Sequence, residues 1–272
     1  MSETRRLMKI VKVNKDFKLN TQLVEFIKSV PNLFENKGDV LHNERNVIKK
    51  FTLGDKVLVV KRYKRPFLFQ RFIYSFFRQT KAKRAFLNAR TLRSRGFVTP
   101  LELGYIEIWK KGLFEDGYLI TEYTEDAAIA ELLVHRKEGF CRDLAKSFAE
   151  FVVNLHLNGI IHLDLNSTNV LYNKENNEFY FSLIDINRMK VYPKNKKISK
   201  EKCLKNLNRF TIDYELFHYV LTEYAKYRGW DERETLIKAI RLKKRFDTHR
   251  RRKKAIYSIL KTITLRKIQN NA

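Results

Sequence analysis

Residues 160–171 have the types and spacing that phosphoryl transfer requires. The stretch, IIHLDLNSTNVL, has the form apolar-apolar-H-x-D-x-x-x-x-N-apolar-apolar, and a second carboxylate, Asp185, ends a downstream apolar run. Phosphoryl transfer depends mainly on positioning and on neutralising charge. A carboxylate must orient and deprotonate the attacking hydroxyl, and Asp164 suits that role. An amide and a second carboxylate must hold Mg²⁺ against the phosphates, which suits Asn169 and Asp185, while His162 would brace the loop through hydrogen bonds.

The alternative interpretation of this stretch is a surface loop whose Asp and Asn side chains cap turns, as these residues often do. The three fixed residues of the pattern occur by chance fairly often. Their context is more specific, because apolar pairs flank the pattern and a polar turn and a strand ending in Asp185 follow it. That context favours phosphoryl transfer.

The segment resembles the catalytic and metal-binding loops of the protein-kinase-like fold, with Asp185-Ile186-Asn187 in the place of the Asp-Phe-Gly of protein kinases. More narrowly, the chain resembles the bacterial lipopolysaccharide kinases, which phosphorylate Kdo or heptose in the lipid A core. The resemblance extends from about Gly38 to Phe210. It is carried by four segments, residues 59–63, 95–100, 162–169 and 184–188.

The resemblance implies an α+β, bilobal protein-kinase-like fold. We place the N-lobe at residues 1–121, with a small antiparallel β-sheet and one main helix, and the mostly helical C-lobe at residues 122–272. Polar turns separate the first three expected strands, and the main N-lobe helix is expected over roughly 80–95. A basic leader and an amphipathic piece are expected before the sheet. Later segments are expected as one helix, a second helix and a hairpin. The expected strands are residues 40–41, 47–48 and 57–60, and the leader and amphipathic piece before them are residues 9–30. The expected helices are residues 127–136 and 140–158, and the hairpin is residues 170–184.

The same resemblance implies ATP and Mg²⁺ as cofactors. Lys61 closes the third expected strand and would reach the ATP phosphates, with Lys64 as a competitor. Adenine would bond to the backbone at Glu122 and Tyr123. Arg45, at the tip of the first hairpin, would supply charge over the phosphates.

Two departures from the kinase pattern stand out. No G-x-G-x-x-G precedes Lys61, and the expected helix over 80–95 contains no glutamate. Kinases usually pair the strand lysine with a glutamate of that helix. Leu87 or Asn88 falls near the position of that glutamate, so the partner of Lys61 stays open.

Charge points to an anionic partner. The chain has 56 Lys and Arg against 30 Asp and Glu, a net charge of +26, and residues 61–95 hold twelve cations and no acidic residue. Nucleic acid, an anionic membrane surface or a phosphorylated substrate would each match this charge. Residues 66–78 are rich in aromatic side chains. They suit either docking on an anionic membrane or packing in the core.

The two cysteines, Cys141 and Cys203, form no metal-binding or disulfide pattern, and they fit a reducing compartment. We find no signal peptide and no apolar run long enough to span a membrane. The expected location is therefore the cytoplasm, and the resemblance to lipopolysaccharide kinases implies a peripheral position at the inner face of the inner membrane. The oligomeric state is left open.

The favoured function is an ATP-dependent kinase that acts on a sugar hydroxyl of the lipid A–core glycolipid, with Arg188 and Lys190 as candidates for contacting the acceptor's anion. A catalytically silent kinase-like scaffold is the main alternative. A protein kinase is disfavoured because Asn166 stands where Ser/Thr kinases carry lysine and because no Ala-Pro-Glu element follows Asp185. Charge alone would suggest nucleic acid, but no binding motif supports a specific one.

Overall fold

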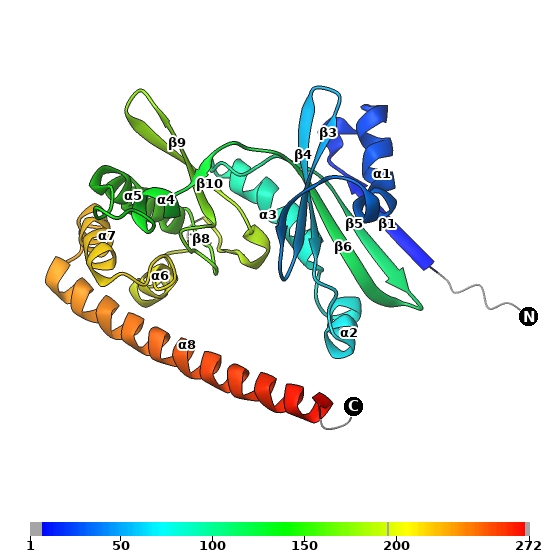
Figure 1. The fold of residues 1–272 in the computed structure, drawn as a ribbon. Coiled ribbons are helices and arrows are strands. Elements are labelled where there is room, and N and C mark those ends of the chain that lie inside the picture. Colours follow the sequence, from blue (N-terminus) through cyan, green and yellow to red (C-terminus); the bar gives the residue numbers. More distant parts are fainter. Residues whose placement is uncertain (1–6, 195, 270–272) are drawn as a thin grey trace, which may run out of the picture. The chain divides into compact units, whose positions relative to one another are not determined.

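The computed structural model describes residues 7–194 and 196–269. They form two compact units (Figure 1). The first unit comprises the described residues up to Ala128 together with residues 162–164 and 168–190. The second comprises residues 129–161, 165–167 and those from 191 onward. The segments that carry the predicted phosphoryl-transfer residues therefore belong to the same unit as the N-terminal sheet, and the lobe boundary after residue 121 stays a prediction.

The first unit is built on an antiparallel sheet of six strands in the order β1-β5-β6-β4-β3-β2. The three expected N-terminal strands correspond to β2, β3 and β4. The bounds are β1 Leu7–Val13, β2 Asp39–Asn43, β3 Val47–Leu53, β4 Lys56–Tyr63, β5 Glu102–Lys110 and β6 Leu113–Glu122.

The expectation of a basic leader over residues 9–30 was wrong at its start. Residues 7–13 form β1, which pairs with β5 from Leu7 opposite Lys110 to Val13 opposite Gly104. Gly104 permits this pairing, because a Cβ at that position would lie 2.7 Å from the carbonyl oxygen of Lys12. The strand was missed because its partner lies about ninety residues downstream.

Helix α1 (Thr21–Asn36) covers one face of the sheet, and the short helix η1 (Lys15–Phe17) precedes it. Asn20 caps its first turn by accepting a 2.9 Å hydrogen bond from the Leu23 amide. One apolar face of α1 packs on alternate residues of the central strands. The shared core comprises Leu23, Phe26, Ile27, Val30, Phe34, Phe51, Leu58, Val60, Leu103, Ile106, Tyr118 and Ile120.

Helix α3 (Lys81–Ser94) confirms the helix expected over 80–95 and packs against β5 and β6. Thr80 caps it, and its buried face carries mainly small residues, which permit close approach. Gly96 follows with φ +82°, the left-handed conformation that favours glycine after a helix. The aromatic stretch before α3 forms α2 (Leu68–Phe76), none of whose residues is buried.

A hairpin completes the first unit and confirms the one expected over 170–184. Strands β9 (Val170–Glu175) and β10 (Glu178–Leu183) join through Asn176 and Asn177, both with positive φ. β9 also pairs with β7 (Ala127–Ala128). Residues 127–136 were expected as one helix, but this pairing takes the first two, and only α4 (Ala130–Leu133) follows. The short helix η2 (Ile186–Arg188) and β11 (Lys190–Val191) come after β10.

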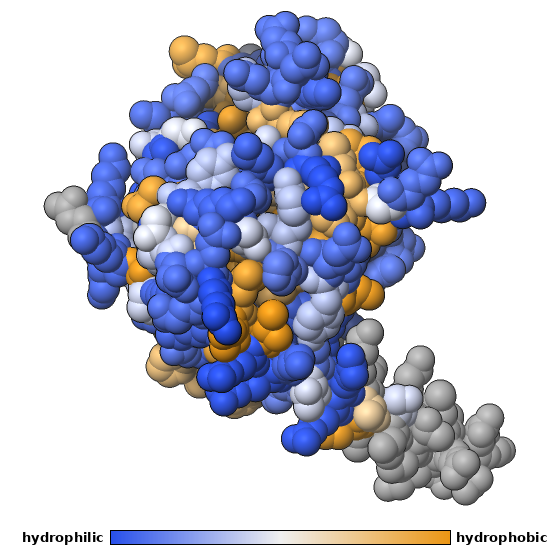
Figure 2. Space-filling view, turned by 90° about the vertical axis from the view of Figure 1, so that its left-hand side faces the viewer, coloured by the Kyte–Doolittle hydropathy of each residue, from blue (hydrophilic) through white to orange (hydrophobic). Residues whose placement is uncertain are grey.

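The second unit is mostly helical. Helix α5 confirms the helix expected over 140–158, and it packs on α7. The elements of the second unit are α4, α5 (Arg142–Leu157), β8 (Ile160–Ile161), α6 (Lys200–Leu207), α7 (Tyr214–Tyr227) and α8 (Glu232–Gln269). The face of the molecule in Figure 2 is mainly hydrophilic, with scattered apolar side chains.

Two buried polar groups connect the helices of the second unit. His156 of α5 lies 2.8 Å from the Tyr224 hydroxyl and 2.9 Å from Asn206 Oδ1. Burial lowers the pKa of His156 to about 4, so the ring stays neutral at pH 7. On α8, the ammonium of Lys243 is fully buried, pairs with Asp247 at 3.2 Å and donates to the carbonyls of Thr211 and Asn208.

Candidate active site

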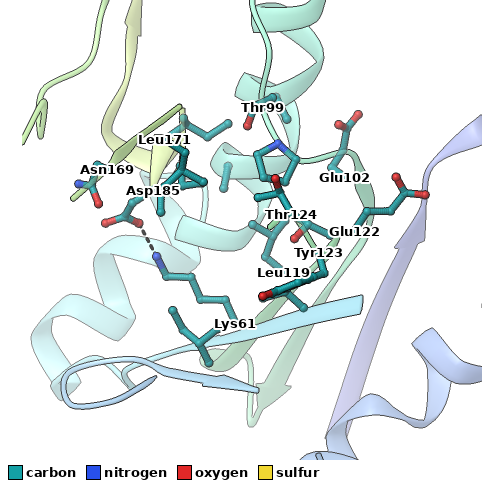
Figure 3. Close-up of a pocket in the computed structure, with 18 of the residues that line it drawn as sticks. Lys61, Thr99, Glu102, Leu119, Glu122, Tyr123, Thr124, Asn169, Leu171 and Asp185 are labelled. Carbon is teal, nitrogen blue, oxygen red and sulfur yellow. Dashed lines mark hydrogen bonds and ion pairs between the residues drawn. The ribbon is translucent and has the colours of Figure 1, made fainter. Parts of the chain in front are cut away.

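The pleat of β4 aims Lys61 away from the core. Leu58 and Val60 pack against α1, so Val59 and Lys61 must point to the opposite face of the sheet. There the Lys61 ammonium meets Asp185, which follows β10, with 2.5 Å between Nζ and Oδ1 (Figure 3).

Asp185 has an unusual backbone. Its φ of +53° and ψ of +40° lie in the left-handed region, which few residues other than glycine, Asn and Asp adopt. Asn187, two residues on, donates a 2.7 Å hydrogen bond to the same carboxylate oxygen. Burial opposes ionisation of Asp185, but Lys61 and these hydrogen bonds together lower its pKa below the ordinary value. Asp185 is therefore a carboxylate at pH 7.

His162 makes hydrogen-bond contacts to two segments of the site. Its Nε2 lies 3.0 Å from the Ile184 carbonyl, and its Nδ1 lies 3.2 Å from the Asp164 amide. A carbonyl only accepts and an amide N–H only donates, so the ring carries its proton on Nε2. Burial lowers the pKa of His162 and keeps the ring neutral.

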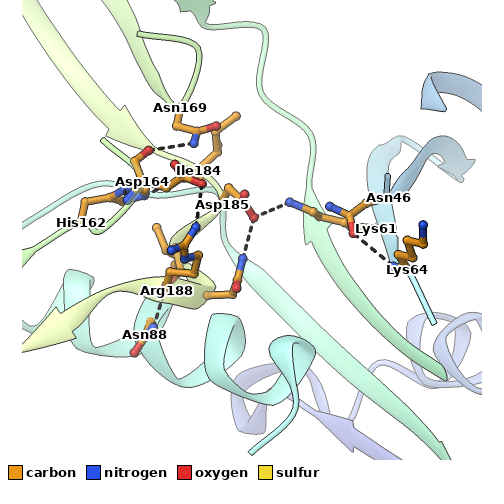
Figure 4. Close-up of polar contacts among 12 residues, drawn as sticks. Asn46, Lys61, Lys64, Asn88, His162, Asp164, Asn169, Ile184, Asp185 and Arg188 are labelled. Atoms are coloured by element: carbon orange, nitrogen blue, oxygen red, sulfur yellow. Dashed lines mark hydrogen bonds and ion pairs between the residues drawn. The ribbon is translucent and has the colours of Figure 1, made fainter. Parts of the chain in front are cut away.

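Asn169 and Asp164 are coupled through the backbone (Figure 4). The Asn169 side chain donates a 3.0 Å hydrogen bond to the Asp164 carbonyl. Because the amide nitrogen makes this bond, the amide oxygen of Asn169 is the atom that could coordinate a metal ion. The Asp164 carboxylate has Arg188 at 3.6 Å, in a pair that is partly open to solvent.

In α3, Asn88 stands near the position where kinases carry a glutamate, and it makes a hydrogen bond to the segment that contains Asp185. Asn88 of α3 donates a 2.7 Å hydrogen bond to the Ile186 carbonyl, next to Asp185. Leu87 is exposed. The helix therefore holds the Asp185 segment directly, and Lys61 takes Asp185 as its ion-pair partner.

A cavity of about 670 Å³ lies beside the Lys61–Asp185 pair. Its volume lies within the range of small-molecule sites. Lys61 is the one lysine or arginine among the described residues that line it. Glu122 and Tyr123 line one side, but their amides already donate to Leu101 and Val57. Thr124 follows them in the lining of the same cavity.

A second cavity, of about 460 Å³, shares Asp185 with the first and is strongly basic. It is lined by Arg45, Asn46, Tyr63, Tyr74, Arg78, Lys81, Arg84, Asp164, Asp185, Asn187 and Arg188. Arg45, predicted over the nucleotide phosphates, and Arg188, predicted for the acceptor, both lie here. Lys190 is exposed on β11 and lines neither cavity.

Sequence reasoning did not place Arg78, Lys81 and Arg84 at this site. For the aromatic stretch and its flanking cations it left two interpretations open, docking on an anionic membrane and packing in the core. The only signal available was the absence of acidic residues over 61–95, which does not show where each cation points.

The oxygen donors suit a magnesium ion. Asp185 supplies a carboxylate and Asn169 an amide oxygen, and Mg²⁺ is usually held by one or two such groups together with substrate phosphates. The described residues contain no group of three or more His, Cys, Asp or Glu that could hold a metal ion.

Comparison with solved structures shows a protein-kinase-like fold, which confirms the predicted fold class. The chain superposes on WaaP in complex with acyl carrier protein with a TM-score of 0.58 and 17% identity, covering 88% of this chain and 98% of that one. The Rio2 kinase–ADP/Mg²⁺–phosphoaspartate complex from Chaetomium thermophilum matches with a TM-score of 0.46 and 12% identity, over 80% of this chain and 76% of that one. A search of curated proteins gave no significant match.

The family comparison is more specific. The model of the lipopolysaccharide kinase (Kdo/WaaP) family matches residues 42–228, which include the β4 lysine and all the loops of the site. With more than half of its length matched, the chain belongs to the lipopolysaccharide kinase (Kdo/WaaP) family.

Proposed function

We propose that this chain is an ATP- and Mg²⁺-dependent kinase that phosphorylates a Kdo or heptose hydroxyl of the lipid A–core glycolipid. The observation that carries the proposal is the position of Asp185. It stands where a cavity of nucleotide size meets a basic cavity that contains Asp164.

The first cavity would hold ATP. Carbonyl groups at Glu122 and Tyr123 would accept from the adenine amino group, and the Thr124 amide, which follows them, would donate. Lys61 would bind a phosphate oxygen. Asp185 and Asn169 would hold Mg²⁺, whose contribution is to neutralise charge on the phosphates.

Asp164 would orient the acceptor hydroxyl and accept its proton as the oxygen bonds to the γ-phosphorus. The bond between that phosphorus and the β,γ-bridging oxygen breaks, and ADP leaves with the electron pair. Arg188 lies 3.6 Å from the Asp164 carboxylate and places positive charge beside it. His162 holds the Asp164 backbone in place and does not touch the reacting atoms.

One observation favours the alternative of a catalytically silent scaffold. Helix α3 has no carboxylate to pair with Lys61, and the Lys61–Asp185 ion pair competes with a metal for Asp185. A scaffold would bind nucleotide without transferring phosphate, so turnover decides between the two functions.

The test is incubation of the purified protein with ATP, Mg²⁺ and lipid A–core acceptors, followed by mass spectrometry of the glycolipid. Phosphorylated acceptor is expected from the wild type. The matched control is Asp164→Ala, for which we expect a rate about 10²–10⁴-fold lower. Absence of product with both Kdo-bearing and heptose-bearing acceptors, or unchanged turnover in Asp164→Ala, would reject the kinase.

The acceptor is amphiphilic, so we also propose peripheral binding at the cytoplasmic face of an anionic membrane. Among the helices that the structure describes, none combines the length and apolar character that crossing a membrane requires. Helix α2 and its flanks instead carry exposed apolar side chains, with Phe67, Phe69 and Phe77 about three-quarters exposed. Arg65 and Arg71 tie this segment to Glu115, so exposed aromatics and fixed cations occur together, as in interfacial segments.

Vesicle flotation at physiological salt tests the membrane part. We expect binding to anionic but not to neutral vesicles, and weaker binding for Phe69→Ser/Phe77→Ser. Leu157→Ser, which removes an apolar side chain that is 58% exposed on α5, is the control. Arg71 is unsuitable as a test position, because it also donates to the Phe114 carbonyl and anchors α2. Equal flotation with both vesicle types would exclude this surface role.

The WaaP structure contains acyl carrier protein, and we propose acyl carrier protein as a candidate partner of this chain on family likeness alone. Co-elution of the two purified proteins in gel filtration would support it. Separate elution at high micromolar concentration would count against it.

A further inference from the structure

We propose that the basic cavity is the subsite for an anionic group of the acceptor, a carboxylate or phosphate next to the reacting hydroxyl, and that Arg78, Lys81 and Arg84 are its ligands. The inference rests on the proposed function, because it places the acceptor hydroxyl at Asp164. It adds a substrate class, since neutral sugars would lack the group that these cations bind.

The distribution of cations between the two cavities is the first argument. Arg45, Arg78, Lys81, Arg84 and Arg188 line the basic cavity, and none of them lines the nucleotide-sized cavity. Among the described residues that line this cavity, the carboxylates are Asp164 and Asp185, of which Asp185 pairs with Lys61 and Asp164 with Arg188. An excess of positive charge is therefore concentrated on the acceptor side of the site.

Of these cations, Arg188 pairs with Asp164, and Arg84 donates a 3.4 Å hydrogen bond to the Thr80 carbonyl. Among the described residues, no ion pair involves Arg45, Arg78, Lys81 or Arg84. The pKa of Lys81 reflects this crowding of like charges, because burial and the nearby Arg45 and Arg84 lower it to about 8. Holding like charges together in a half-buried place is unfavourable unless an anion joins them.

The second, independent argument is an orphaned hydroxyl. Tyr63 is 4% exposed, and its hydroxyl has no hydrogen-bond partner among the described residues. The residue lines both cavities, with Lys61 and Lys81 each close to its ring. Burial raises the pKa of Tyr63, so the group stays a donor. A buried unmatched donor is uncommon in native proteins, and an anion oxygen at the junction would match it.

The local fold explains why these residues converge. Thr80 caps α3, donating to Glu107 and accepting from the Lys83 amide, so the first turn of α3 is held in place. Lys81 and Arg84 lie three residues apart, on the same side of this helix. Arg78 enters from the segment between α2 and α3. The first turn of the helix also presents its positive dipole end to an anion.

Steady-state kinetics with single variants test the subsite. Arg78→Gln, Lys81→Gln and Arg84→Gln are expected to raise the acceptor KM about 10- to 100-fold, the effect of losing one charge-assisted hydrogen bond. The KM for ATP should stay within about twofold, a margin set by the lack of contact with the nucleotide cavity. Lys83→Gln is the matched control, because it removes the same charge from the same helical turn but lines neither cavity. A rise in the ATP KM with the acceptor KM unchanged would overturn the inference and leave the kinase proposal standing.

A binding measurement separates the two proposals. Inorganic pyrophosphate is titrated calorimetrically into the protein saturated with Mg²⁺ and a non-hydrolysable ATP analogue, so that the nucleotide cavity is filled. We expect weaker binding by Lys81→Gln and Tyr63→Phe than by wild type and Lys83→Gln, with thermal melts confirming that each variant is folded. Equal affinity in all four proteins would overturn the subsite. If the wild type transfers no phosphate, the kinase proposal fails, and this titration still decides whether the cavity binds anions.

Discussion

Two lysine–aspartate pairs in the molecule have opposite designs. In the second unit, Lys243 and Asp247 are 3.2 Å apart, and two backbone carbonyls take the other donors of the fully buried ammonium. In the first unit, Lys61 and Asp185 are 2.5 Å apart, but both side chains line a cavity, and Asp185 has a left-handed backbone.

The two pairs differ in how many hydrogen-bond donors of the lysine ammonium already have an acceptor. An ammonium has three donors, and Lys243 has three acceptors for them. Its pair is complete and holds α8 to the segment after α6. Lys61 has one carboxylate and an aromatic ring beside it, so a nucleotide phosphate can replace or join its partner. A saturated pair serves stability, and an unsaturated pair on a cavity wall serves binding.

Asp185→Asn should separate the two designs most clearly. Asn tolerates the left-handed backbone, so we expect the melting temperature to change by only a few degrees. Phosphate transfer should fall about 10²–10⁴-fold, because the metal loses its carboxylate. Thermal melts and turnover at saturating acceptor are the measurements. Wild-type turnover, or wild-type Mg²⁺ dependence of nucleotide binding, would contradict the assignment of Asp185 as a metal ligand.

Lys243→Ala should give the reverse pattern. The change leaves a carboxylate and two carbonyls without their donor, and such losses typically lower the free energy of unfolding by about 3–5 kcal/mol. Specific activity per folded molecule should not change. Urea denaturation measures the first quantity.

The double variant Lys243→Met/Asp247→Leu sharpens this prediction. Replacing both partners by apolar residues is often nearly neutral, so it should recover part of the lost stability. A single variant as stable as wild type would show that Lys243 is not essential to this packing.

His156 is a third buried group, and its effect on stability depends on pH. Its pKa is lowered to about 4 in the folded protein and is about 6.5 in the unfolded chain. Between these values the unfolded chain binds the extra proton, so stability is complete above pH 6.5 and falls as the pH drops toward 4. The loss amounts to about 3 kcal/mol over that window. Urea denaturation at pH 7 and pH 5 should show a smaller difference for His156→Gln than for wild type. An equal difference would assign the acid sensitivity to other groups.

The smallest expected effect concerns Lys81 in the basic cavity, with its pKa of about 8. Above that pH it loses its charge, so the acceptor KM should rise by less than about tenfold between pH 7 and pH 9. The charged groups that face it are Arg45, Arg84, Lys61 and Asp185. Lys81→Arg, which stays charged, should flatten the profile. A profile as steep as that of wild type would exclude Lys81 as its origin.

The site residues that were predictable from the sequence are those whose chemistry needs short spacing. His162, Asp164 and Asn169 lie within one loop, and a turn places Asp185 after the next strand, so the local pattern indicated them together. Lys61 was predictable because an apolar strand precedes it.

What escaped prediction depends on contacts between distant segments. Neither the pairing of β1 with β5 nor the orientation of Arg78 and Lys81 leaves a periodic trace, because each depends on where a whole element packs. The partner of Lys61 was open for the same reason. Only the fold shows that Asn88 reaches the Ile186 carbonyl and that Asp185 takes the ion pair.

The pairing of β1 with β5 has a consequence for synthesis. Strands β3 and β4 can pair as soon as they leave the ribosome. Strand β1 has no strand to pair with until Gly104 and the rest of β5 emerge. At about 5–20 residues per second, that delay is on the order of 5–20 s. During it, the apolar face of α1 lacks much of the surface that it later covers. Residues 7–36 are therefore made well before the strand that completes their packing, so a chaperone or a pause in translation would act most strongly on them.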